Sequence, residues 1–187
     1  MMTTGTLKYW LHRGGVLLPL LWLFFGMQPH LHAQDNEYLL KAGFLERFTR
    51  FIDWPEDSLQ LNPALPFTIL VMGKSPFNGE LEDFFRQIRV KNRKVRIRYS
   101  ATADTTRSAH LIYICSDMAK KLPGILRYTQ GKPIITVGET RGFAEKGVLI
   151  NFFLENNKIR FEINQSAFKR SGLKVSYLLM NSARVIP

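Results

Sequence analysis

Three short, continuous runs of apolar residues constrain the fold of this chain more than any other feature. They read PFTILVMG, HLIYIC and PIITVG, and they occupy residues 66–73, 110–115 and 133–138. Their length and their β-branched content favour strands over helices. A strand that is apolar at every position is covered on both faces, as in the centre of a parallel sheet with helices on each side. The sequence therefore predicts an α/β fold.

The segments around these runs have the spacing of amphipathic helices. Over residues 37–52, an aromatic stripe recurs at Leu40, Phe44 and Phe48, and Asp35 is placed to cap the first turn. We expect this stripe to pack into the core. Further helices are predicted over residues 78–88, over residues 116–131 and, in two pieces divided by Gly172, over residues 166–184.

Two other patterns predict strands that have a different environment. Residues 94–99 alternate strictly between basic and apolar side chains, which predicts a strand with one face in solvent. Residues 148–154 and 158–164 flank three polar residues, which predicts a β-hairpin. We therefore expect a single α/β domain with a mixed, mostly parallel sheet, helices on both faces and a β-hairpin (148–164) near the C-terminus.

The first 33 residues have the pattern of a secretory signal peptide. Lys8 and Arg13 precede an apolar run of about thirteen residues, which is too short to span a hydrocarbon core of ~30 Å. A short polar stretch then ends at Ala33, where we expect cleavage. An uncleaved N-terminal anchor is the alternative. The prediction is an exported protein with residues 1–33 as signal peptide and residues 34–187 as the mature domain.

Loss of such a leader reduces the set of reactive side chains. His110 is the only histidine after residue 33, and Cys115 is the only cysteine of the chain. This argues against a histidine-based metal site, a multi-cysteine metal site and an internal disulfide, and no cofactor is implied. We expect Cys115 to be an inert core thiol. An intermolecular disulfide is the alternative, because an exported protein with one cysteine permits it.

The formal charge of +11 comes from 26 basic and 15 acidic residues, and its distribution decides which partners it suggests. A pI near 10 suggests nucleic acid or an anionic membrane as partner only if the charge is clustered and the protein is located where such a partner occurs. Two basic residues lie in the leader and seven lie within residues 86–98, which leaves 17 basic against 15 acidic residues elsewhere. The mature domain is thus nearly neutral outside one basic stripe, and nucleic acid is excluded as a partner.

The basic stripe reads RQIRVKNRKVRIR and contains no acidic residue. Its members are Arg86, Arg89, Lys91, Arg93, Lys94, Arg96 and Arg98. One interpretation is an edge strand that its charge protects against pairing with other sheets. The other is contact with an anionic membrane surface or an acidic partner, where each basic residue contributes ~1 kcal/mol. Both interpretations explain the charge equally well.

A second candidate site follows from the strand pattern. Ligands of open α/β sheets bind in a crevice outside the carboxyl ends of the strands. The residues that follow the three apolar runs are Gly73, Lys74, Ser75, Ser116, Asp117, Gly138 and Glu139. They predict a crevice for a small anion or metabolite. A nucleotide loop is not expected, because a P-loop needs a glycine five residues before Gly73, where Thr68 stands.

Four segments resemble the YfiR-like family of bacterial periplasmic proteins. They read LLKAGFLERFTRFIDWP, ILVMGKSPF, LINFFLENNKIRFEIN and SGLKVSYLLMNSARVI, and the similarity extends in order over residues 37–186. The resemblance implies regulation rather than catalysis, since the family's namesake represses a membrane-bound diguanylate cyclase by holding its sensor domain inactive. The namesake pairs its cysteines in disulfides, whereas Cys115 stands alone here. Redox control through a disulfide therefore does not carry over.

The leading hypothesis is a periplasmic regulator that binds the sensor domain of a membrane signalling protein of the diguanylate cyclase or kinase type. Tyr177, Leu178 and the surroundings of Trp54 are candidate contacts if they are exposed. An anionic membrane surface and a second copy of the chain, in a homodimer, are further candidate partners. The runner-up is a periplasmic small-ligand binding protein that uses the strand-end crevice. A hydrolase ranks last because the sequence offers no nucleophile–base pair. Asp117 and His110 do not supply acid–base chemistry together, because they lie at opposite ends of one predicted strand, ~20 Å apart.

Overall fold

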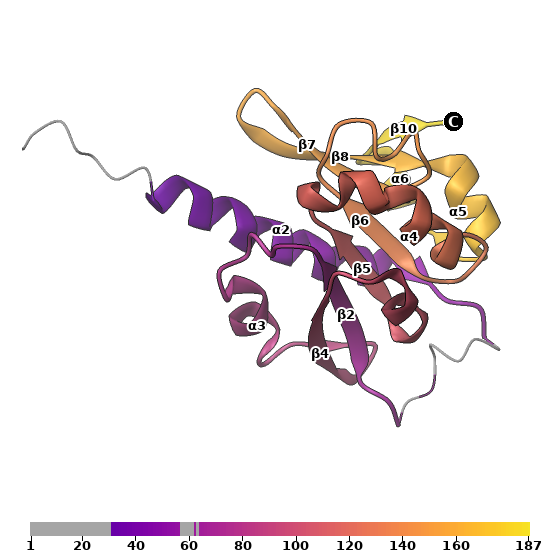
Figure 1. Cartoon of the computed structure of the whole chain (residues 1–187), viewed down its shortest axis with the longest axis horizontal. Coiled ribbons are helices and arrows are strands. Elements are labelled where there is room, and N and C mark those ends of the chain that lie inside the picture. The colour runs from indigo at the N-terminus through magenta and orange to yellow at the C-terminus, as the bar shows by residue number, and fades with distance from the viewer. Residues whose placement is uncertain (1–30, 57–61, 63) are drawn as a thin grey trace, which may run out of the picture. The chain divides into compact units, whose positions relative to one another are not determined.

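The computed structural model describes residues 31–56, 62 and 64–187, and a sheet of eight strands lies at its centre (Figure 1). Its strands are β2 (Phe67–Met72), β3 (Arg89–Val90), β4 (Arg93–Ser100), β5 (Leu111–Ile114), β6 (Ile135–Gly138), β7 (Ile150–Glu155), β8 (Lys158–Asn164) and β10 (Arg184–Ile186). Their order across the sheet is β10-β8-β7-β6-β5-β2-β4-β3. The five strands from β7 to β4 are parallel, whereas β8, β10 and β3 run in the opposite direction.

The three apolar runs form the middle of this sheet, as predicted. β5 lies between β2 and β6 and pairs with both, and every residue of these three strands is buried. A strand with no exposed position must have a layer of side chains on each face. The α/β class, the single domain and the mostly parallel sheet are confirmed.

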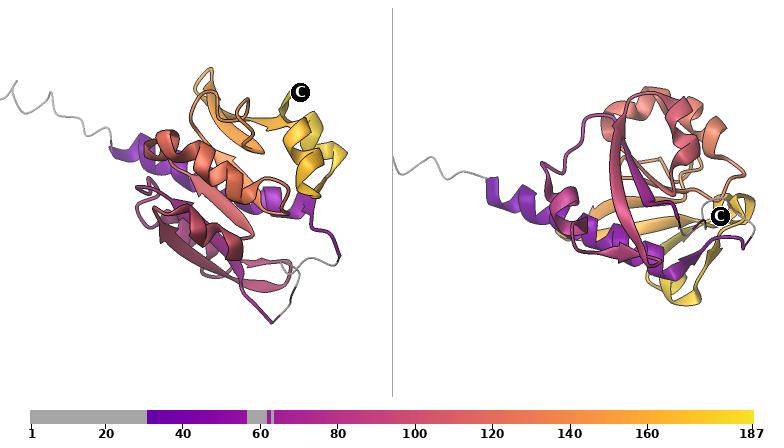
Figure 2. Two further views of the ribbon diagram at one scale, coloured as in Figure 1. Left: turned by 45° about the vertical axis from the view of Figure 1, so that its right-hand side comes forward. Right: turned by 90° about the horizontal axis from the view of Figure 1, so that it is seen from below.

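Helices supply these two layers. They are α2 (Leu31–Phe51), α3 (Glu80–Phe85), α4 (Leu122–Thr129), α5 (Gln165–Ser171) and α6 (Tyr177–Asn181), together with the 3₁₀ helices η2 (Ala103–Ser108) and η3 (Ser116–Lys121). Figure 2 shows α2 and α4 on opposite sides of the sheet. On the α2 side, Leu45 and Phe48 pack with strand residues such as Tyr113. On the α4 side, Leu122 and Ile125 pack with Ile112 and Leu70.

The N-terminal helix differs from its prediction at both its start and its stripe. α2 begins at Leu31, so Asp35 lies within the helix and does not cap it. Phe48 is fully buried and its ring lies 5.0 Å from that of Phe161, which confirms that the stripe reaches the core. Leu40, however, is 59% exposed, so the first member of the stripe faces outward. Residues 1–30 of the expected leader lie outside the described residues, and its cleavage stays a prediction.

The predicted β-hairpin is confirmed with a shorter loop. β7 and β8 are antiparallel and Glu155 pairs with Lys158, which leaves only Asn156 and Asn157 between the strands. Both asparagines have positive φ angles, of 50° and 60°. A two-residue turn with φ above zero at both positions matches the right-handed twist of the strands, and asparagine tolerates this conformation well.

The C-terminal segment contains less helix than predicted. α5 ends at Ser171, and the cap residue Gly172 has a φ of 75°, the left-handed conformation that glycine favours. The second predicted helix is reduced to α6, because β9 (Lys174–Val175) pairs with β1 (Ile52–Asp53) and β10 pairs with β8. Arg184 of β10 also forms an ion pair with Glu162 at 2.6 Å. Backbone pairing with distant strands thus overrides local helical spacing.

Candidate functional site

The predicted strand-end crevice is assembled at the expected edge of the sheet, but protein atoms occupy much of it. Gly73 follows β2 with a φ of +98°. A Cβ atom at this position would lie 2.2 Å from Oδ1 of Asp117 and 2.7 Å from Cγ of Met118. At Gly138, it would lie 2.6 Å from the ring of Phe143. These two glycines therefore allow close packing of neighbouring loops rather than leaving room for a ligand.

The polar residues of the crevice are also engaged with the protein. Oδ2 of Asp117 accepts a hydrogen bond from the backbone amide of Lys74 at 3.1 Å, which ties the β2 and β5 ends together. Ser75 accepts a hydrogen bond from the amide of Phe77 at 3.3 Å in a turn, and α3 begins later than predicted, with Gly79 as its N-cap. Ser116 is the first residue of η3 and does not cap it, because the N-cap position belongs to Cys115.

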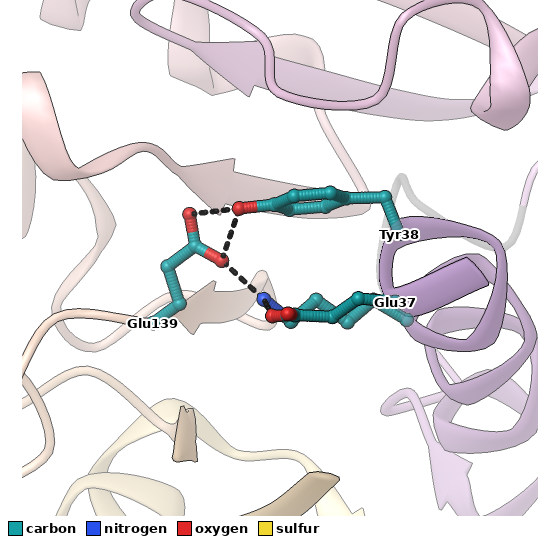
Figure 3. A network of polar contacts seen from close by, with 4 residues as sticks. Glu37, Tyr38 and Glu139 are labelled. Atoms are coloured by element: carbon teal, nitrogen blue, oxygen red, sulfur yellow. Dashed lines mark hydrogen bonds and ion pairs between the residues drawn. The ribbon is translucent and has the colours of Figure 1, made fainter. Parts of the chain in front are cut away.

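The N-terminal half of α2 closes the remaining part of this edge through the Lys41 cluster, which comprises Glu37, Tyr38, Lys41 and Glu139. Figure 3 shows Glu37 and Tyr38 on the helix facing Glu139, which follows β6. The amine of Lys41 lies 2.6 Å from Oε1 of Glu37 and 2.6 Å from Oε2 of Glu139. Its side chain is only 5% exposed. One buried cation is thus shared by two carboxylates, which is how a buried charge becomes tolerable.

Two tyrosines extend this cluster into the core. The hydroxyl of Tyr38 donates to Glu139 at 3.3 Å, and its ring lies 5.3 Å from the ring of Phe77. Burial and then the negative charge of Glu139 raise the pKa of Tyr38 above its ordinary value. The same two causes raise the pKa of Tyr113. Both phenols therefore remain neutral at physiological pH, and neither is activated as a base.

Cys115 lies beside this edge and is buried, as predicted. Burial, and then the negative charges of Asp117 and Glu139, raise the pKa of its thiol to about 12. Since the thiolate is the reactive form, the thiol is inert at neutral pH. Burial also keeps the sulfur out of reach of a second copy of the chain, which disfavours the intermolecular disulfide.

The opposite side of α2 carries a different kind of feature, a groove open to solvent that we call the α2 groove. It has a volume of about 860 Å³. Its lining residues are Leu39, Leu40, Gly43, Phe44, Glu46, Arg47, Phe48, Arg50, Phe51, Phe84, Phe161, Leu178, Leu179 and Ser182. Most of these side chains are apolar, and Leu40 and Leu178 are 59% and 66% exposed. An exposed apolar area of this kind usually marks an interaction site.

The candidate contact residues named from the sequence differ in their exposure to solvent. Tyr177 and Leu178 lie on α6 and are exposed, so they meet the condition set for them. Trp54 is 5% exposed and packs edge-on against Phe67 at 5.6 Å, so it belongs to the core. Leu39 and Leu40 were missed. Leu39 lies beside the stripe of Leu40 and Phe44 and widens the apolar arc of the helix, and this extra width could have indicated a second apolar face.

The basic stripe is divided by the fold rather than continuous. Arg86 pairs with Asp83, and Lys91 lies 2.8 Å from Asp53. Lys94, Arg96 and Arg98 are exposed on one face of β4, and Arg89 is exposed on β3.

Arg93 is the member of the stripe that the structure removes from the surface. It is 5% exposed, and its guanidinium lies 5.5 Å from the centre of the Phe67 ring and 3.2 Å from Nε2 of His110. The other ring nitrogen of His110 accepts a hydrogen bond from the amide of Thr68 at 2.9 Å. The histidine therefore holds the start of β2 and β5 in place, at the opposite end of the sheet from Asp117.

The described residues form an α/β domain in which the open α2 groove is the candidate binding surface. Among the described residues, no group of three or more histidine, cysteine or acidic side chains could hold a metal ion. No helix within that part of the chain is long and apolar enough to cross a membrane. The chain belongs to the YfiR/HmsC-like family (DUF4154), whose model matches residues 38–184. Membership of this family suggests a periplasmic regulator of cyclic-di-GMP signalling.

Comparison with other proteins adds information on the fold alone. No curated protein matches the chain. The structure is similar to the ABC domain of Streptococcus pneumoniae in complex with L-Trp, with a TM-score of 0.52, 11% identity and coverage of 75% of this chain and 61% of that one. A conserved domain protein of Vibrio cholerae O1 biovar El Tor has a TM-score of 0.46, 10% identity and coverage of 67% and 56%. The chain thus spans about three fifths of the length of these structures.

Proposed function

We propose that this protein is a periplasmic regulator that binds the sensor domain of a membrane signalling protein of the cyclic-di-GMP type through the α2 groove. Export by the predicted signal peptide is part of this proposal. The observation that carries it is the groove itself, because apolar side chains line an open surface of the helix at the edge of the family match. Family membership supports the class of partner.

The dimensions of the groove suit a protein segment better than a small molecule. It follows α2 from Leu39 to Phe51, which corresponds to ~18 Å at 1.5 Å per residue. Phe84 of α3 and Leu178 of α6 also line it. An apolar channel of this length between helices accommodates the apolar face of a partner helix or loop.

The charges at the rim indicate the character of the partner's flanks. Arg50 is paired with Glu46 at 2.6 Å, so its charge is compensated. Arg47 is exposed, and no acidic side chain of the described residues forms an ion pair with it. A partner with an apolar anchor and an acidic residue beside it would complement this rim.

The alternative function, a small-ligand binding protein that uses the strand-end crevice, receives less support. The Lys41 cluster, Asp117 and the side chains around Gly73 and Gly138 occupy the place where such a ligand would bind. A ligand would have to displace a buried ion pair, which is costly. We therefore assign these crevice residues a structural role.

The proposal is tested by capture from membranes. Mature protein beginning at residue 34 is used as bait on detergent-solubilised membranes of the source bacterium, and retained proteins are identified by mass spectrometry. The variant Leu40→Glu/Leu178→Glu places two charges in the groove at exposed positions, so the fold is retained. Leu154→Glu is the matched control, because Leu154 is 58% exposed on β7 and lies outside the groove.

We expect the wild type and the control to retain a membrane protein with a periplasmic sensor domain, and the groove variant to lose it. Retention by the groove variant would refute the groove as the binding surface. Recovery of no sensor protein by the wild type would count against the regulatory function itself. Absence of the chain from the periplasmic fraction, or a mature N-terminus still at residue 1, would contradict the predicted export.

A further inference from the structure

The outer edge of β4 is a second surface feature, apart from the α2 groove, that the described chain leaves uncovered. β2 pairs with β4 from Val95 to Ser100. On the opposite edge, β3 pairs only with Arg93 and Lys94. Among the described residues, no strand pairs with residues 95–99 on that edge. A stretch of ~17 Å of strand edge is therefore open.

The hydrogen-bond pattern identifies which backbone groups face outward. The carbonyl of Ser100 accepts a hydrogen bond from the amide of Gly73 at 3.1 Å, and Ser100 is in register with Met72. In a parallel ladder, the N–H and C=O groups of such a residue both point to the same neighbour, and those of the next residue point away. Arg96 and Arg98 thus bond to β2, whereas Ile97 and Tyr99 direct their backbone groups to the open edge.

The two faces beside this edge differ in chemistry. On the α3 side, a groove of about 480 Å³ contains the apolar side chains of Phe85, Ile88, Val95 and Ile97. Its lining also includes the polar or charged residues Glu82, Arg86, Gln87, Arg89 and Lys94. On the other face, Arg96 and Arg98 are exposed, and within the described part of the chain no acidic side chain forms an ion pair with either. A partly apolar groove therefore lies on one face of the open edge, and two arginines lie on the other.

We propose that the open edge of β4 binds an extended, acidic segment of a partner protein by β-strand addition. Main-chain hydrogen bonds to Ile97 and Tyr99 supply the attachment. Alternate side chains of the incoming strand fall on opposite faces, so aliphatic residues enter the groove and acidic residues meet Arg96 and Arg98. The segment recognised is one in which acidic and aliphatic residues alternate.

Two other occupants fit this edge less well. A second copy of the chain would pair β4 with β4 and place arginines opposite arginines, which destabilises a pair of strands. An anionic membrane would satisfy the cations, but it offers no strand to the exposed amides and carbonyls and no side chain to the groove. The edge shares no residue with the α2 groove, so this proposal does not depend on the function of that groove.

The experiment measures binding of two blocked octapeptides to the mature protein. One alternates glutamate and valine, and the other has four glutamates followed by four valines. We expect the alternating peptide to bind at least tenfold more tightly than the block peptide. Arg96→Glu/Arg98→Glu should weaken its binding at least tenfold. Lys169→Glu/Arg170→Glu, which makes the same charge change at exposed positions of α5, should leave binding unchanged.

Amide hydrogen exchange of the wild-type protein reports the pairing directly. In the free protein, the amides of Ile97 and Tyr99 should exchange faster than those of Arg96 and Arg98, and the alternating peptide should slow them at least tenfold. Equal binding of the two peptides, no binding of either, or unchanged exchange at Ile97 and Tyr99 would overturn the proposal. Stronger binding to phosphatidylglycerol vesicles than to the peptide, lost in the arginine variant, would also overturn it and assign the face to the membrane.

Discussion

The two sides of α2 come from one stretch of sequence but differ in chemistry and in exposure to solvent. The inner side contributes Lys41 to a buried ion cluster in which each charge has a partner. The outer side contributes Leu40 and Phe44 to a groove that the described chain leaves open. The inner contacts fix the helix against the end of the sheet, and this fixed helix can then present an apolar surface. The difference shows that the charged site is structural and that the apolar surface is the candidate for function.

The largest effect is expected from the inner side. Lys41→Met leaves Glu139 and Glu37 without their shared cation, and Glu139 is 13% exposed. We expect the free energy of unfolding to fall by about 2–3 kcal/mol, below the range for fully buried pairs because Glu37 keeps partial contact with solvent. Urea titration measures the change. Adding Glu139→Gln should restore part of the loss, and a loss below about 0.5 kcal/mol would mean that the cluster is not a structural anchor.

The outer side should show the reverse behaviour. Leu40→Glu alone should weaken binding of the sensor domain about tenfold, which corresponds to 1.4 kcal/mol, since it places a charge in the apolar channel. The free energy of unfolding should change by less than about 0.5 kcal/mol, because the position is exposed. Isothermal titration calorimetry and urea unfolding on the same sample test both statements. A large loss of stability with unchanged binding would reverse the roles of the two sides.

The loss of stability at alkaline pH tests the burial of Cys115, which lies at the strand-end edge that the inner side of α2 covers. The pKa of Cys115 is about 12 in the folded protein, whereas the unfolded thiol has a value near 9. Between these values the folded state holds a proton that the unfolded state has lost, so stability is fully present below pH 9 and falls as the pH rises. One such group contributes a slope of about 1.4 kcal/mol per pH unit. The free energy of unfolding of Cys115→Ala should therefore fall less steeply than that of the wild type between pH 9 and 12. An unchanged slope would contradict the raised pKa of the buried thiol.

The smallest effect concerns the floor of the groove. Gly43 lies within α2, and a Cβ atom there would lie 3.8 Å from Phe84, an ordinary contact distance. Gly43→Ala should stabilise the protein by about 0.5–1 kcal/mol, because alanine restricts the unfolded chain and favours the helix. Thermal unfolding measures this gain. A destabilised variant would show that Phe84 and α2 pack more closely at the groove than the structure indicates.

The sequence predicts the strands of the core because their signal is local. β2, β5 and β6 are continuous apolar runs, and burial on both faces requires that composition. β1, β3, β9 and β10 contain two or three residues each and form only where distant backbone segments meet. A pattern of two or three residues is too short to predict such pairing, so these strands were missed.

The same difference applies to the candidate sites: features set by neighbouring residues could be predicted, and features set by distant segments could not. The strand-end residues lie at one edge of the sheet because the ends of parallel strands meet there, and a role in ligand binding stays a prediction. Their occupation by the protein itself depends on Lys41 reaching Glu139, 98 residues further along the chain. The spacing of Glu37 and Lys41 suggests an ion pair on a helix but gives no hint of the third member. The α2 groove depends likewise on α3 and α6, which only the fold brings beside α2.

One measurement tests the central claim, that the α2 groove and not the strand-end crevice binds the partner. The affinity of the captured sensor domain is compared for Leu40→Glu/Leu178→Glu and for Lys74→Ala/Ser116→Ala, each confirmed as folded by circular dichroism. Our account predicts at least a hundredfold loss of affinity for the groove variant and a change below twofold for the crevice variant. Full affinity of the groove variant together with loss in the crevice variant would contradict it.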